Sequence, residues 1–91
     1  MAMTLKELSK ITGTDIVITW YCQSAENWVA NLASAEISDG SFLTSEYGRG
    51  PSPNAALRDY VQNIRGKRLV INASSKEHRQ EFNVPETLEV E

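Results

Sequence analysis

Apolar residues stand at every second position through much of the first half of this chain, and this is the spacing of β-strands. Residues 15–23 form the clearest run, in which isoleucine and tryptophan alternate with valine, threonine and tyrosine. A second strand is expected from Trp28 to about Ala35. A third follows over residues 41–47, after the hairpin-turn signal Asp39-Gly40. The three segments predict an antiparallel meander.

Two other segments carry apolar residues at helical spacing. The first is about two turns long, because Thr4 and Glu7 fit a capping box and Gly13 can supply a left-handed cap. The second begins with Pro53, directly after the N-cap residue Ser52. Its apolar stripe consists of Pro53, Ala56, Leu57, Tyr60, Val61 and Ile64.

The remainder of the chain completes the predicted fold. Gly66 ends the main helix, residues 69–71 predict a fourth strand, and a further strand within residues 76–84 is left open. The order α-β-β-β-α-β(-β) predicts an α+β fold, with the main helix packed on one face of an antiparallel sheet and a short N-terminal helix. Residues 1–85 are interpreted as a single α+β domain, and residues 86–91 as an acidic C-terminal tail that is frayed.

The second face of the predicted sheet lacks an assigned cover. Val17, Tyr21, Val29 and Val70 would lie on it, and they are too apolar for a surface that meets only water. The first helix, a second copy of the chain or a partner protein would cover this face. Trp20 and Trp28 are expected in the core, and either of them would be an interface anchor if it were exposed.

Composition limits the function classes. The chain has 91 residues, of which 41% are hydrophobic and 23% are charged, as in a single globular domain. The apolar runs are short and residues 1–4 lack signal-peptide features, so a cytoplasmic protein without membrane contact is expected. One cysteine, Cys22, and one histidine, His78, disfavour disulfides and most metal sites.

Catalytic chemistry has little support in the sequence. Cys22 lies among apolar strand residues, His78 lies in a polar turn, and the carboxylates are scattered over turns and strand ends. We therefore expect no catalytic residues, no cofactor, no metal and no enzyme activity.

Positively charged residues provide the other candidates for binding. Gly48-Arg49-Gly50 precedes the main helix, where an anion could bind, but the segment has no lysine and two prolines follow it. The glycines are therefore interpreted as turn residues. The candidate partner-binding residues are Tyr21, Arg49, Arg65, Lys67 and Arg68. A net charge of −3 disfavours nucleic acid as the partner of the four basic residues.

Two segments, Trp28–Leu32 and Gly48–Tyr60, together resemble the core of HicB-type antitoxin domains. In that family an aromatic-x-Ala strand precedes a helix start of the pattern Gly-x-Thr/Ser-x-x-x-Ala-Leu. The resemblance implies a dsRBD-like β-β-β-α-β fold and a protein that binds and blocks a small nuclease toxin. Residues 34–40 replace the family's Pro-Asp/Glu-Leu-Pro-Gly segment, and the N-terminal helix is additional.

The size and acidity of the chain are also similar to those of small phage and prophage early-region proteins, anti-CRISPR proteins among them. The leading hypothesis is a non-catalytic phage- or prophage-type binding protein that docks on and inhibits a protein partner, such as a host or toxin nuclease. The alternatives are a small nucleic-acid-binding module that uses the basic residues and a structural homodimer paired through a sheet face or edge.

Overall fold

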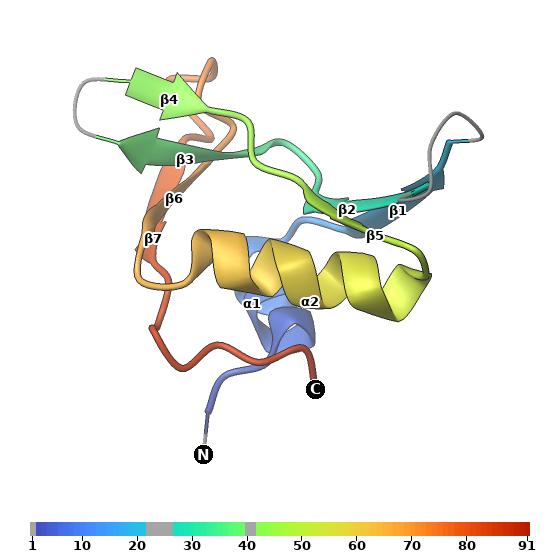
Figure 1. Cartoon of the computed structure of the whole chain (residues 1–91). Coiled ribbons are helices and arrows are strands. Elements are labelled where there is room, and N and C mark those ends of the chain that lie inside the picture. The colour runs from blue at the N-terminus through green and yellow to red at the C-terminus, as the bar shows by residue number, and fades with distance from the viewer. Residues whose placement is uncertain (1, 22–26, 40–41) are drawn as a thin grey trace.

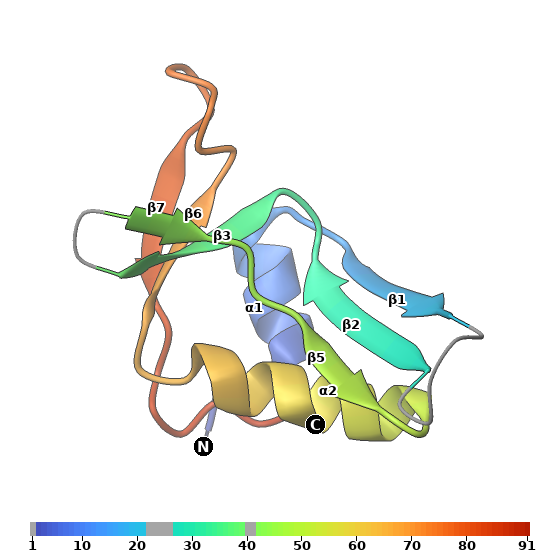
Figure 2. The same ribbon diagram turned by 45° about the horizontal axis from the view of Figure 1, so that its top comes forward.

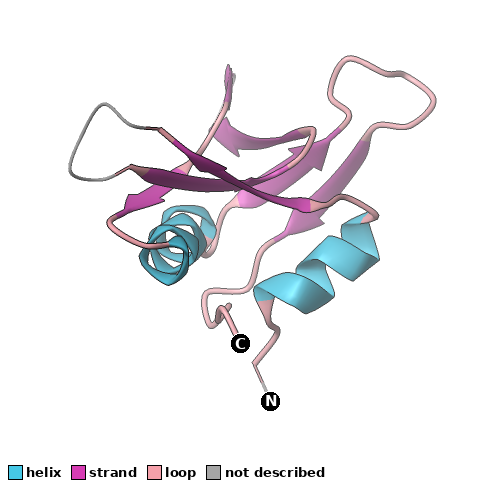
Figure 3. Cartoon of the chain, turned by 90° about the vertical axis from the view of Figure 1, so that its right-hand side faces the viewer, coloured by secondary structure: helices cyan, strands magenta, loops and turns pink. Residues whose placement is uncertain are grey.

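The computed structural model describes residues 2–21, 27–39 and 42–91, and both helices lie on the same side of the strands (Figures 1 and 3). The predicted α+β class, with a short helix before the strands and a main helix after them, is confirmed. The elements are α1 (Leu5–Thr12), β1 (Ile16–Trp20), β2 (Trp28–Leu32), β3 (Ala35–Asp39), β4 (Phe42–Thr44), β5 (Gly48–Gly50), α2 (Pro53–Ile64), β6 (Arg68–Ile71) and β7 (Gln80–Asn83).

The strands form two antiparallel sheets, of order β1-β2-β5 and β4-β3-β6-β7, where the sequence predicted one meander (Figure 2). The prediction of one strand from Trp28 to Ala35 is wrong, because the chain turns at Ser34, whose φ is 57°. Left-handed backbone at a non-glycine residue ends a strand. The chain therefore passes from the first sheet into the second at this residue.

Other strand predictions have different outcomes. The fourth predicted strand is β6, and the segment left open at residues 76–84 contains β7. The third predicted strand is shorter than expected and is β4. Cys22, residues 24–26 of the first connection and Gly40 of the predicted hairpin turn lie outside the described residues.

The predicted helix caps are confirmed. The Thr4 hydroxyl accepts a hydrogen bond from the Glu7 backbone N–H at 3.2 Å, and the Glu7 carboxylate accepts one from the Thr4 N–H at 3.1 Å. Gly13 supplies the left-handed cap, with a φ of 72°. At the start of α2, the Ser52 hydroxyl accepts a hydrogen bond from the Ala55 N–H at 3.1 Å. Local sequence therefore determines where these helices begin.

Gly48 and Gly50 lie in strand β5 and are buried against α2, so their interpretation as turn residues is wrong. A Cβ atom on Gly48 would lie 2.1 Å from the Ala56 carbonyl oxygen and 2.3 Å from the Tyr60 backbone nitrogen. A Cβ atom on Gly50 would lie 2.6 Å from the Ala55 Cβ. Glycine is required here because the strand and the helix backbone approach each other closely.

The helices and both sheets share one hydrophobic core. The predicted stripe of α2 faces it, with Ala56, Tyr60, Val61 and Ile64 buried and Leu57 packed against them. The other buried members of the core are Leu5, Leu8, Ala30, Leu32, Ile37, Leu69, Ile71, Val84 and Leu88.

The C-terminal tail is docked, which differs from the expectation that it is frayed. Leu88 is fully buried in the core, and the Arg65 Nε donates a hydrogen bond to its carbonyl oxygen at 2.7 Å. Glu89 forms a parallel bridge to Thr4, with the Leu5 N–H donating to the Glu89 carbonyl at 2.8 Å. The tail is therefore held beside the start of α1. No helix among the described residues is long and apolar enough to cross a membrane.

The substitution Gly48→Ala is expected to lower the free energy of unfolding by about 3 kcal/mol or more, because the new methyl group meets helix backbone that cannot move aside. Gly13→Ala is the matched control: its site is open, and only the positive φ costs about 1–2 kcal/mol. Urea denaturation of both variants tests this order. Equal losses would contradict the close strand–helix contact.

The substitution Leu88→Ala is expected to lower the free energy of unfolding by about 2–5 kcal/mol, as for other fully buried leucines. Thr87→Ala, at the exposed neighbouring position, should change it by less than about 0.5 kcal/mol. Thermal denaturation of the two variants distinguishes a docked tail from a frayed one, for which neither substitution would matter.

Candidate protein-docking surfaces

The four predicted basic residues do not form one patch. Arg49 lies in β5, whose glycines contact α2 between Ala55 and Tyr60, whereas Arg65 and Lys67 follow the end of that helix. Arg68 begins β6 in the other sheet. The structure therefore separates Arg49 from the other three residues.

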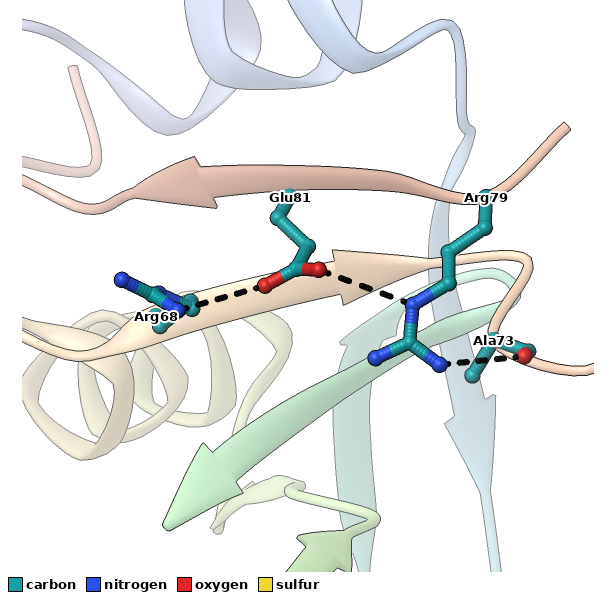
Figure 4. Close-up of polar contacts among 4 residues, drawn as sticks. All are labelled: Arg68, Ala73, Arg79 and Glu81. Carbon is teal, nitrogen blue, oxygen red and sulfur yellow. Dashed lines mark hydrogen bonds and ion pairs between the residues drawn. The ribbon is translucent and has the colours of Figure 1, made fainter. Parts of the chain in front are cut away.

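Two of these arginines have partners within the chain. Arg65 holds the tail through Leu88, and Arg68 lies 3.4 Å from the Glu81 carboxylate. The second Glu81 oxygen lies 3.6 Å from the Nε of Arg79, and the Nη1 of the same arginine donates to the Ala73 carbonyl oxygen (Figure 4). Such exposed pairs contribute at most about 1 kcal/mol to stability. Their effect here is to neutralise part of the positive charge.

The expected apolar outer face of the sheet is covered in part: Val29 and Val70 are buried, Val17 is half-buried and Tyr21 is exposed. Val70 is buried, and it lies directly opposite Glu36 on β3 and Glu81 on β7. Val29 is buried in the same way, opposite Arg49 on β5. Long charged side chains cover apolar neighbours with their methylene groups. For Val29 and Val70 the expected cover by the first helix, a second copy or a partner is therefore replaced by charged residues of the neighbouring strands.

Among the described residues, six of the seven large exposed apolar side chains lie in, or within three residues of, two strands at sheet edges, β1 and β4. We call Ile18, Trp20 and Tyr21 the β1 surface, with exposed fractions of 40%, 54% and 55%. We call Phe42, Leu43 and Tyr47 the β4 surface, in which Phe42 is 76% exposed. The sequence predicts Tyr21 as a partner-binding residue, and it predicts Trp20 as an interface anchor on the condition that Trp20 is exposed. The β4 residues were missed.

Both surfaces lie in one unusual stretch of the sequence. Residues 11–48 contain no lysine, arginine or histidine, whereas all nine basic residues of the chain lie outside them. The same stretch contains five acidic residues, which are Asp15, Glu26, Glu36, Asp39 and Glu46. This charge asymmetry is the signal that could have indicated the β4 surface from sequence.

Polar side chains of α2 close one edge of the first sheet. The Arg49 N–H, in the edge strand β5, donates to the Asp59 carboxylate at 2.8 Å. The Asn63 side-chain amide donates to the Tyr47 carbonyl oxygen at 3.0 Å, just before that strand. The β5 edge is therefore occupied by the helix, whereas β1 forms the opposite edge.

One hollow on the surface carries mixed charge. It has a volume of about 340 Å³, lies between α2 and the tail and is lined by two arginines and two glutamates, with Asn54 and Val90; the charged residues are Arg58, Arg65, Glu89 and Glu91. Among the described residues, no group of three or more His, Cys, Asp or Glu side chains could hold a metal ion.

Tyr60 of α2 is a buried titratable residue. Burial raises the pKa of its phenol above the ordinary value, a hydrogen bond with the Leu32 backbone partly offsets this, and the nearby Glu46 carboxylate raises the pKa further. Tyr60 lies in the core and not on either docking surface.

No family model, curated protein or solved structure matches this chain. The similarity to HicB-type domains therefore remains a prediction from sequence.

The free energy of unfolding is expected to fall as pH rises above about 10, because the unfolded Tyr60 ionises near that value while the folded phenol, with its raised pKa, keeps its proton. This group adds a slope of at most about 1.4 kcal/mol per pH unit. Tyr60→Phe should remove that part of the slope, and Tyr47→Phe, at an exposed tyrosine, should keep it. Urea denaturation between pH 9 and 11.5 measures the slope for each variant. Identical slopes for the two variants would contradict the assignment of this pH dependence to Tyr60.

Proposed function

We propose that this chain is a non-catalytic binding protein that docks on a protein partner with a basic surface. The observation that carries this proposal is that the β1 and β4 surfaces both lie in the stretch of residues 11–48, which has acidic residues and no basic ones. Aromatic side chains are the usual anchors of protein interfaces. Acidic residues around such anchors favour a positively charged partner.

The β4 surface is the better candidate for this partner. Phe42 has the largest exposed fraction of the large apolar side chains among the described residues. It belongs to the β3–β4 hairpin, which extends from the body of the molecule (Figure 1). Glu36 on β3 and Glu46 after β4 add negative charge beside the hairpin. A highly exposed aromatic residue in a part of the chain that has acidic and no basic residues suits a pocket with a basic rim.

A nuclease is the partner class that the HicB-type resemblance implies, and the charge distribution supports it. Nucleases bind polyanions, so their substrate sites present lysine and arginine. An acidic protein is attracted to such a site over several ångströms and competes there with the nucleic acid. We therefore propose inhibition of a nuclease, of the kind used by antitoxins and by phage or prophage proteins, as the consequence of docking.

Direct nucleic-acid binding has weaker support. Arg49 lies apart from Arg65, Lys67 and Arg68, and Arg68 is paired with Glu81. A row of free cations is what a phosphate backbone requires. A nucleic-acid-binding module would therefore need a continuous basic surface, and these four residues do not provide one.

The substitution Phe42→Ala is expected to weaken retention of a basic partner from host extract at least about 30-fold, the effect of losing an interface anchor worth about 2 kcal/mol. Ile11→Ala is the matched control, since Ile11 is also exposed but lies on α1. Retention on immobilised wild-type protein and on both variants measures this, followed by assay of RNA or DNA cleavage by the retained partner with and without added chain.

Two results would contradict the proposal: retention of no basic protein, or equal retention by the wild-type and Phe42→Ala proteins. Salt-dependent binding of an RNA or DNA oligonucleotide, lost on substitution of Lys67 and Arg68, would support the nucleic-acid alternative instead.

A further inference from the structure

The backbone of β1 leaves one row of hydrogen-bonding groups at the open edge of the first sheet. The Tyr21 N–H donates to the Asn27 carbonyl at 2.7 Å, and the Ala33 N–H donates to the Asp15 carbonyl at 2.9 Å. Backbone direction alternates along an antiparallel strand. Odd-numbered residues of β1 therefore point their N–H and C=O groups toward β2, and Ile16, Ile18 and Trp20 point theirs away from it.

Within residues 2–21, 27–39 and 42–91, this edge has no counterpart of the side-chain hydrogen bonds by which Asp59 and Asn63 close the β5 edge. Figure 2 shows β1 as the outermost strand of its sheet. Residues 16–21 also contain no charged residue and no proline, the residue types that usually prevent edge strands from pairing. A long apolar edge without such protection accepts another strand.

We propose that a second copy of this chain occupies this edge, with the two β1 strands antiparallel and the two-fold axis at Ile18. Ile18 then pairs with Ile18 of the second copy, and Ile16 with Trp20 in both directions. This register uses the outward groups of all three residues, so each of them finds a complementary group. The result is a continuous six-stranded sheet of order β5-β2-β1-β1-β2-β5.

The side chains fit the same arrangement. Ile18 and Trp20 lie directly opposite Ala30 and Trp28, on the face of the sheet where α2 packs. Helix α2 packs on β2 and β5 but leaves these two side chains of β1 exposed. In the dimer the exposed side chains of both copies meet in the middle of the helix-facing side. The two-fold axis keeps the same face of each sheet on the same side.

Charge does not oppose this pairing. Among the described residues, Asp15 is the acidic residue that directly flanks β1, and in this register it lies opposite Tyr21 of the second copy, whose hydroxyl can donate to a carboxylate. The two Asp15 residues are separated by six strand positions, or about 20 Å. That distance exceeds the screening length of about 8 Å at physiological salt.

The available area indicates a weak dimer. An aromatic side chain buries roughly 150–250 Å², so the exposed fractions of the β1 surface offer roughly 300 Å² per copy. Two copies with their paired backbone edges then bury on the order of 1,000 Å², the lower end of specific interfaces. We therefore expect association at micromolar to millimolar concentrations.

Sedimentation equilibrium from about 10 μM to 1 mM is expected to show the mass rising from 10.1 kDa toward twice that value. Ile18→Lys should keep the protein monomeric throughout, because pairing at the axis would bring two charges together. Phe42→Lys, on the β4 surface, should dimerise like the wild-type protein. Circular dichroism confirms that both variants are folded.

Cysteine cross-linking tests the register. In a Cys22→Ser background, Ile18→Cys should form an intermolecular disulfide at least tenfold faster than Phe42→Cys, although Phe42 is more exposed, because only position 18 meets itself across the axis.

Four outcomes would overturn the proposal. These are a monomer at 1 mM, equal cross-linking rates, open-ended aggregation, or loss on Ile18→Lys of a retained host protein with no change in self-association. The last result would assign the β1 edge to a strand of another protein. None of them depends on whether Phe42 binds a basic partner, so this proposal and the proposed function fail independently.

Discussion

The close packing of β5 on α2 is the contact on which the other features of the first sheet depend. Gly48 and Gly50 allow the strand backbone to reach the helix backbone at Ala56 and Tyr60. At that separation Asp59 and Asn63 reach the strand edge, and the Tyr60 hydroxyl bonds with the Leu32 backbone. Two glycines thus position the polar groups that close this edge of the sheet.

Because α2 closes only the β5 edge, the two edges of the first sheet differ. Helix α2 cannot cover β1 while it lies against β5 and β2, so Ile18 and Trp20 extend the core-facing side of the sheet into solvent. Exposed apolar area of this kind costs about 25 cal/mol per Å² until another surface covers it. The fold therefore has a physical reason to associate at β1 and none at β5.

Local signals in the sequence predicted the caps at Thr4 and Ser52 and the apolar stripe of α2, because capping and helical periodicity act within a few residues. Long-range effects were not predictable in this way. A serine gives no sign that it will adopt a left-handed φ, as Ser34 does, and two glycines before a helix fit a loop as well as a close contact. A single leucine among glutamates, Leu88, likewise gave little indication of burial.

The exposure of the edge strand β1 is likewise a long-range effect that local sequence does not reveal. Alternation predicted correctly that Ile18 and Trp20 share a face, but the width of a helix decides how many strands of that face it covers. The β1 and β4 surfaces lie in different sheets, so pairing at β1 leaves Phe42 free. A dimer would then present two acidic, aromatic hairpins. Such a pair binds a partner with two sites more tightly than one hairpin does, because the second contact forms within a complex that already exists.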